Sequence, residues 1–231
     1  MRGRVAGVIV AGGASRRMGE DKAFLLCRDR RTFLQRGIER LLPLVPTVIV
    51  AGRKAEDQQL LVGDAGEAQR VVVIPDRDAD CGPLAGILAA FDWLEASSFP
   101  PPRSGGLLVT PVDMPEVTTA DCREILAAAA AAKDEKRPVV ASFDGLQREP
   151  LLGYYPQALH HALRLLADSP HRSLQRWLAA TDHTLLRLPP RGQVNLNTPA
   201  QLAAWRHSTA GEISSPAEQS THGRRVDESS G

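Results

Sequence analysis

Short apolar runs alternate with longer amphipathic stretches along most of the chain. The apolar runs are rich in Val, Ile and Leu, and glycine, proline or aspartate closes them, which is typical of buried strands. The longer stretches repeat apolar residues at three- and four-residue spacing, which predicts helices. We predict strands at residues 5–11, 47–51, 70–74, 106–110 and 138–142, and helices at about 33–42, 83–96, 119–132, 157–167, 173–181 and 200–206.

Strands separated by helical stretches predict an α/β fold with a mostly parallel sheet. In such folds ligands bind at the carboxyl ends of the strands, so the residues just after each strand become candidates for function. The segment 208–231 holds six serines and only two large aliphatic residues, Ile213 and Val226. It cannot bury enough apolar surface to fold, and we predict one domain at 1–207 with a disordered tail at 208–231.

The loop after the first strand carries the sharpest chemical signal. Gly12 and Gly13 permit a sharp turn and close approach of a ligand, while Ser15, Arg17 and Lys22 add hydrogen-bond donors and positive charge. Fixed N–H groups with Arg and Lys suit a polyphosphate. The spacing matches neither the Walker pattern nor the dinucleotide-binding fingerprint. The alternative is a glycine-rich turn with solvated arginines.

Carboxylates follow two later strands. Asp76, Asp78 and Asp80 precede the Gly82-Pro83 start of a helix, where helix capping or solvation is an alternative explanation for Asp78 and Asp80. Asp113 stands between Pro111 and Pro115 directly after the fourth strand. A rigid carboxylate beside a triphosphate is sufficient to hold Mg²⁺, although an aspartate in a proline turn is also common.

The last motif is Val194-Asn195-Leu196-Asn197-Thr198-Pro199. Asn197 or Thr198 can cap the following helix, with Pro199 in its first turn. Capping explains Thr198-Pro199 fully but leaves Asn195 without a structural reason, so a ligand contact and helix capping remain alternatives for the asparagine pair.

Residues 10–22 resemble the nucleotide-binding signature of the molybdenum cofactor guanylyltransferases, Leu/Val-Ala-Gly-Gly-x-Ser-x-Arg-Met-Gly-x-Asp-Lys. Gly-Pro-Leu-Ala-Gly, Pro-x-Asp-x-Pro and Asn-x-Asn-Thr-Pro follow in the family's order, and 147–156 resembles its strand near the acceptor. The resemblance covers residues 5–206. It implies a three-layer α/β/α sandwich with a mostly parallel, mixed central sheet, a Rossmann-like nucleotidyltransferase domain.

The resemblance implies transfer of GMP from GTP to the phosphate of molybdopterin or Mo-molybdopterin, with release of pyrophosphate. It implies Mg²⁺ as the cofactor, and molybdoenzymes, their chaperones or other cofactor-biosynthesis proteins as further partners. It places Lys22 on the α-phosphate, Arg17 on the outer phosphates and Asp113 on the metal. The remaining expected ligand contacts are Val10, Ala11, Gly12, Gly13, Ser15, Gly52, Asp76 (with Asp78 or Asp80 as alternatives), Gly82, Asn195 and Asn197.

Two other functions remain open. Relatives often carry an asparagine in the nucleoside pocket where this chain has Gly52-Arg53, which leaves room for a cytidylyltransferase that makes the cytosine form of the cofactor. Gly12-Gly13 and Asp21-Lys22 favour guanine. A non-catalytic nucleotide-binding or chaperone-like partner of a molybdoenzyme is the second alternative, and the presence of Lys22 and Asp113 opposes it.

Composition narrows the partners and the compartment. The 231 residues include 43% hydrophobic and 4% aromatic residues, with a net charge of +1, which gives no indication of nucleic-acid binding. No apolar run approaches the ~18 residues of a membrane span. Three separated cysteines predict a reducing cytoplasm. The histidines lack metal-ligand spacing, so we expect His160, His161, His171 and His183 on the surface.

Overall fold

A computed structural model describes residues 4–12, 21–57, 68–76, 81–97, 105–132 and 134–208. Within these residues, seven strands form one sheet in the order β3-β2-β1-β4-β6-β5-β7. The strands are β1 (Arg4–Val10), β2 (Val48–Ala51), β3 (Val71–Ile74), β4 (Gly105–Pro111), β5 (Val139–Ser142), β6 (Glu149–Pro156) and β7 (Thr184–Arg187).

The sheet is mixed, as predicted. Strands β3, β2, β1 and β4 run parallel to one another, whereas β6 is antiparallel to both β4 and β5. In β1 and β4 the register pairs Val8 with Val109 and Val10 with Pro111. The carboxyl ends of β1 and β4 therefore lie side by side, and the loops after them leave the sheet at the same edge.

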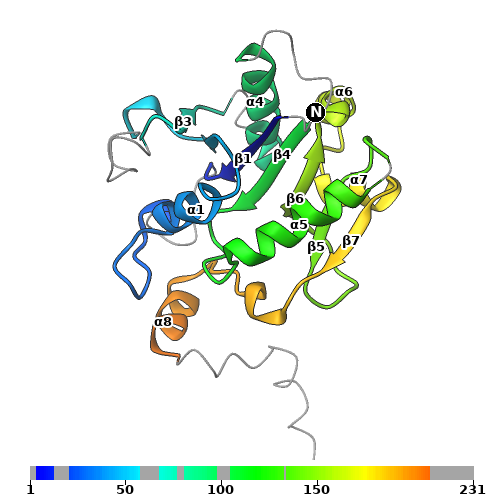
Figure 1. The fold of residues 1–231 in the computed structure, drawn as a ribbon. Coiled ribbons are helices and arrows are strands. Elements are labelled where there is room, and N and C mark those ends of the chain that lie inside the picture. The colour runs from blue at the N-terminus through cyan, green and yellow to red at the C-terminus, as the bar shows by residue number, and fades with distance from the viewer. Residues whose placement is uncertain are drawn as a thin grey trace, which may run out of the picture.

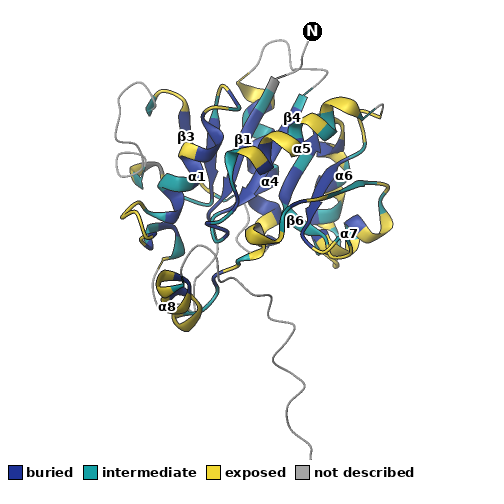
Figure 2. Cartoon of the chain, turned by 60° about the horizontal axis from the view of Figure 1, so that its bottom comes forward, coloured by how far each residue is buried: buried dark blue, intermediate teal, exposed yellow. Residues whose placement is uncertain are grey.

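Helices cover both faces of the sheet, which confirms the predicted three-layer sandwich (Figure 1). Helices α1 (Phe33–Leu41) and α5 (Thr119–Ala131) pack on one face. Helices α4 (Pro83–Ala96), α6 (His160–Asp168) and α7 (Leu174–Ala180) pack on the other. The strands between them are buried, and the outer helix surfaces are exposed (Figure 2).

The helix boundaries follow from local capping. Thr32 and Thr118 each accept from the backbone N–H three residues ahead, and the side chain at that position bonds back, so both helices begin with a capping box. Thr198 does the same for α8 (Pro199–His207), which settles the structural role of that threonine. Helix α8 packs Leu202 and Trp205 against the segment around Leu25.

Some boundaries differ from the prediction. Strand β7 was not predicted, because its four residues lie at the sheet edge, are mostly half-buried and show no alternation. Residues 157–159 form a 3₁₀ turn before α6 rather than its first turn. The predicted tail lies outside the described residues from 209 onward. Within the described segments, no helix combines the length and the apolar character that a membrane span requires.

Candidate functional site

The carboxyl ends of β1, β2 and β3 converge on a pair of glycines. A Cβ added at Gly52 would lie 2.3 Å from Gly12 Cα, and Gly52 has φ +85. Both the lack of space and the backbone angle therefore require glycine at this position. A Cβ at Gly12 would lie 2.3 Å from Asp76 Oδ2. Gly12, Gly52 and Asp76 thus form one tight corner, and they are three of the residues predicted to hold a nucleoside.

Asp76 has an unusual electrostatic position in this corner. Its carboxylate lies against the glycines and the first turns of α4, 3.4 Å from where a Cβ of Gly86 would stand. Burial raises the pKa of Asp76, because desolvation disfavours its charged form. A ligand that donates hydrogen bonds, such as a ribose hydroxyl or a base N–H, would relieve that cost.

The backbone groups beside this corner are partly used by the fold. Val10 and Ala11 are buried, and the N–H of Ala11 donates to Ala51 O at 2.9 Å. That N–H therefore serves the sheet, and the contact of Ala11 with a ligand stays a prediction. Gly82 ends its loop at φ +55 immediately before Pro83 and α4, and a Cβ there would meet nothing. The backbone angle, rather than lack of space, favours glycine at that position.

A second group of predicted residues meets at the end of β4. Lys22 lies in the 3₁₀ turn η1 (Lys22–Phe24), and its Nζ is 2.9 Å from Asp113 Oδ2 and 2.6 Å from Asn197 Oδ1. Asn197 Nδ2 donates to Asn195 Oδ1 at 2.9 Å. We call Lys22, Asp113, Asn195 and Asn197 the phosphate-site cluster. Its members are up to 175 residues apart in sequence.

The asparagine motif is fixed to the aspartate loop through the backbone. Leu196 N–H donates to the carbonyl of Asp113 at 3.1 Å. The side chains of Lys22 and Asp113 are 17% and 19% exposed, so both reach solvent while being largely enclosed. The carboxylate and amide oxygens are hard donors of the kind that Mg²⁺ prefers, and the donor set therefore fits that ion.

Sequence reasoning missed one carboxylate near this cluster. Glu149 opens β6, the antiparallel neighbour of β4. Burial raises the pKa of Glu149, and the charges of Asp144 and Asp113 raise it further. The β4–β6 pairing brings Glu149 toward Asp113, and its place in the 147–156 segment did not by itself mark it as a neighbour of that residue.

Part of the predicted site lies outside the described residues. This applies to Gly13, Ser15 and Arg17 in the first loop and to Asp78 and Asp80 after β3. Their expected contacts remain predictions. Asp76 is the described member of the aspartate series, and it lies at the nucleoside corner.

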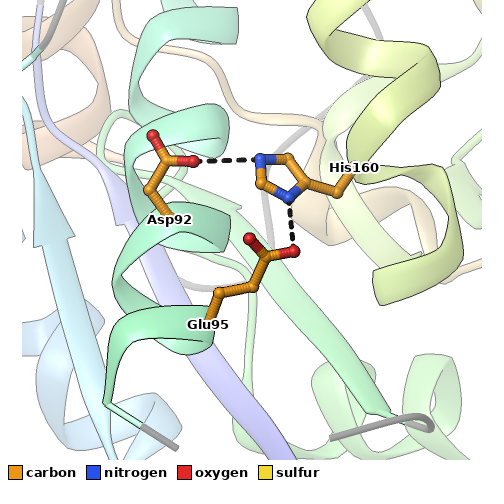
Figure 3. Close-up of side chains that lie close together, drawn as sticks. All are labelled: Asp92, Glu95 and His160. Carbon is orange, nitrogen blue, oxygen red and sulfur yellow. Dashed lines mark hydrogen bonds and ion pairs between the residues drawn. The ribbon is translucent and has the colours of Figure 1, made fainter. Parts of the chain in front are cut away.

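A separate charged group lies between α4 and α6, and we call it the helix-pair cluster (Asp92, Glu95 and His160). His160 is 6% exposed, so the prediction of a surface position was wrong. Its ring stacks on Phe91 at 5.2 Å. Figure 3 shows the ring between the two carboxylates, with Nε2 3.1 Å from Asp92 Oδ1 and Nδ1 2.9 Å from Glu95 Oε1.

The helix-pair cluster has ligand types that could hold a metal, all within 4.8 Å of one another. The arrangement instead favours a set of ion pairs that connects α4 to α6. Each ring nitrogen faces its own carboxylate, Arg164 also pairs with Asp92, and Gln157 donates to Glu95. Asp92 and Glu95 belong to the last turns of α4, whereas Asp76 lies by its first turns. The cluster is therefore remote from the nucleoside corner.

The similarities to known proteins agree with this geometry. The model of the MobA-like NTP transferase domain matches residues 7–185. A probable molybdenum cofactor guanylyltransferase of Rhodopirellula baltica is 32% identical, over 88% of this chain and 92% of its own. The chain belongs to the MobA-like NTP transferase family.

A second relative and a solved structure also match over most of their length. A molybdenum cofactor guanylyltransferase of Shewanella halifaxensis is 27% identical, over 92% of this chain and 98% of its own. The solved structure of molybdopterin-guanine dinucleotide biosynthesis protein A from Archaeoglobus fulgidus has a TM-score of 0.62 at 20% identity, and covers 87% of this chain and 96% of its own. That structure supports the fold.

As a MobA-like NTP transferase domain, the chain is a nucleotidyltransferase. The two described groups suit the two parts of a nucleoside triphosphate. The corner around Asp76 is compact and accepts hydrogen bonds, whereas the phosphate-site cluster offers a cation and oxygen ligands. Both lie at the carboxyl ends of the parallel strands, where the fold predicts ligands.

Proposed function

We propose that the protein is a molybdenum cofactor guanylyltransferase, which transfers GMP from GTP to the phosphate of molybdopterin or Mo-molybdopterin and releases pyrophosphate. Relatives with that name cover most of the chain. The observation that carries the proposal is the convergence of Lys22, Asp113 and Asn197 at one point. A cation and a metal-binding carboxylate side by side are what a phosphoryl-transfer site requires.

Each residue has a role in this proposal. Lys22 holds the α-phosphate and Asp113 holds Mg²⁺, with Glu149 as a nearby second carboxylate. Asp76 and the backbone around Gly12 hold the nucleoside, Arg17 contacts the outer phosphates, and Asn195 and Asn197 face the pterin. When bound, Mg²⁺ neutralises charge on the phosphates and orients them.

The chemistry leaves little for acid–base groups to do. The acceptor phosphate is already an anion, so it needs no general base to attack the α-phosphorus, and pyrophosphate departs as an anion. Positioning and neutralisation of charge therefore supply the rate. The enclosed setting of Lys22 and Asp113 strengthens both effects. Cys27, Cys81 and Cys122 are buried and lie far apart in the sequence, and we infer that the protein acts in the reducing cytoplasm.

Base selectivity is the point that separates the proposal from its nearest rival. Gly52 cannot carry a base-reading side chain, because any Cβ there would collide with Gly12. Guanine would then be selected by backbone groups and by Asp76, which accepts hydrogen bonds and therefore suits the N1–H and N2 amino donors of guanine. Cytosine presents only its amino group as a donor.

Calorimetric titration with GTP, CTP and ATP, each with Mg²⁺, tests this proposal. We expect GTP to bind at least ~10-fold more tightly than either competitor, about the value of one good hydrogen-bonded pair. A preference for CTP would assign the protein to cytidylyl transfer. Failure to bind any of the three would contradict nucleotidyl transfer and leave the chaperone-like partner of a molybdoenzyme as the remaining alternative.

A further inference from the structure

Arg53 is an enclosed arginine at the end of β2 whose role neither the motifs nor the proposed reaction explains. It follows Gly52, and its N–H donates to Ile74 O at 3.2 Å. Its side chain is only 11% exposed. Enclosing a charged side chain is unfavourable unless it is paired, so the contacts of Arg53 indicate its purpose.

Two of those contacts are with the turn that carries Lys22 or with the residue that caps this turn. Both Nη atoms donate to the carboxylate of Asp21, a two-pronged arrangement that only arginine can make. The guanidinium lies 4.9 Å from the centroid of the Phe24 ring, a cation–π contact. Asp57 lies 4.0 Å from Nη1. Arg53 thus contacts η1 at both of its ends.

Asp21 connects this arginine to the phosphate-site cluster. Asp21 is the N-cap residue of η1, and its Oδ1 accepts from the N–H of Ala23, the second residue of this turn, at 3.1 Å. The Lys22 side chain then reaches Asp113 and Asn197. A displacement of Asp21 would shift the backbone from which the ammonium group extends, and misplacement by about 1 Å can cost ~100-fold in rate.

We propose that Arg53 is a positioning residue for Lys22. Through its paired hydrogen bonds to Asp21, and by stacking on Phe24, it holds η1 at the end of β2, so that the Lys22 ammonium stays where the α-phosphate binds. This inference rests on the role proposed for Lys22. It also gives a function to Asp21, which precedes Lys22 in the loop motif.

A double-mutant cycle between Arg53 and Lys22 tests the proposal. The variants are Arg53→Gln, Arg53→Lys, Asp21→Asn, Lys22→Ala and the double variant Lys22→Ala with Arg53→Gln. Arg176→Gln, at an exposed position in α7, is the control. Each is measured for kcat and KM in GMP transfer to purified Mo-molybdopterin, for the Kd of GTP by calorimetry, and for thermal stability.

We expect Arg53→Gln and Asp21→Asn to lower kcat by ~10-fold and to change the Kd of GTP by less than about threefold, because the lysine is displaced while the nucleoside corner remains. Arg53→Lys should recover part of the rate, since it retains charge without the two-pronged geometry. In the Lys22→Ala background Arg53→Gln should lower kcat by less than about twofold further, because no lysine remains to be positioned. Arg176→Gln should match the wild type.

Three outcomes would overturn the proposal. If the losses multiply in the double variant, Arg53 acts independently of Lys22. If Arg53→Gln weakens GTP binding by more than ~10-fold at unchanged kcat, Arg53 is a nucleotide contact. If Lys22→Ala retains the wild-type kcat, Lys22 does not have its proposed role, and Arg53 has no lysine to position. This third outcome contradicts the proposed function of Lys22, whereas the first two contradict only the role of Arg53. If Arg53→Gln does not fold, Asp21→Asn tests the same hydrogen-bonded pair, and the same changes in kcat and Kd are expected. Asp21 is the more exposed partner, so its substitution disturbs the fold less.

Discussion

The phosphate-site cluster and the helix-pair cluster are built from similar groups but are arranged differently. In the first, one ammonium group is approached by oxygens from two loops, and the side chains remain partly open to solvent. In the second, one imidazole ring is enclosed between two carboxylates of a single helix (Figure 3). A cation among acidic oxygens is therefore not by itself evidence of a ligand site.

The position in the fold explains the difference. The phosphate-site cluster lies where parallel strands end, so its side chains come from the connections that follow those strands. The helix-pair cluster lies between two helices that pack on the sheet, and its polar groups bond to one another. The first arrangement leaves room for exchange of a ligand, whereas the second connects two elements of the fold.

The largest expected effect separates the clusters by activity. Asp113→Ala should lower GMP transfer by at least ~100-fold, because the carboxylate that holds the metal is lost. It should also abolish binding of Mn²⁺, measured by electron paramagnetic resonance. Asp182→Ala, at a 77% exposed position, is the matched control and should change neither. Full activity of Asp113→Ala would remove the metal role.

The second prediction concerns the helix-pair cluster, where we expect a substitution to lower stability and to leave activity unchanged. His160→Leu should lower the free energy of unfolding by about 1–3 kcal/mol, because Glu95 loses its hydrogen-bonding partner and Asp92 loses an ion-pair partner. Its kcat should stay unchanged. His161→Leu is the control, since His161 is the exposed neighbour and should change stability by less than about 0.5 kcal/mol. Urea unfolding measures both, and a lower kcat for His160→Leu at equal stability would indicate a catalytic role instead.

Asp76 offers a smaller effect with a defined pH dependence. Because burial raises its pKa, the folded state binds this proton more tightly than the unfolded state, and stability decreases as pH rises through that range. Asp76→Asn should therefore be more stable than the wild type at pH 7, and the difference should vanish at acidic pH, where Asp76 is protonated in both states. Its GTP affinity should decrease by ~10-fold with the lost acceptor.

Thermal unfolding at several pH values and calorimetry with GTP measure these two changes. Asp134→Asn, on an exposed loop, is the control. Equal stability of Asp76→Asn and the wild type across the whole pH range would show that the carboxylate is not desolvated. Unchanged GTP affinity would remove Asp76 from the nucleoside site.

The smallest expected effect is that of removing residues 208–231. The composition of this segment predicts that it contributes neither to the core nor to the site. We expect the melting temperature and kcat of the shortened chain to match those of the full chain. A clear loss of either would assign the segment a role in folding or catalysis.

The sequence by itself determined most of the elements and the chemistry of the strand ends. Valine-rich runs closed by glycine, proline or aspartate identified five strands, because burial on both faces demands apolar residues throughout. Capping residues such as Thr32 and the Gly82-Pro83 pair located helix starts, because they satisfy backbone groups locally. Lys22, Asp76 and Asp113 were found as candidates because each follows a strand within a short motif.

Only the tertiary structure decided which of these side chains meet and what the remaining charges do. Asn197 reaches Lys22 across 175 residues, Glu149 approaches Asp113 through strand pairing, and Arg53 turns toward Asp21. His160 became buried because α6 packs on α4. Local patterns indicate the helix, strand or turn to which a residue belongs. Contacts between distant segments depend on strand order and helix packing, which no single stretch of sequence encodes.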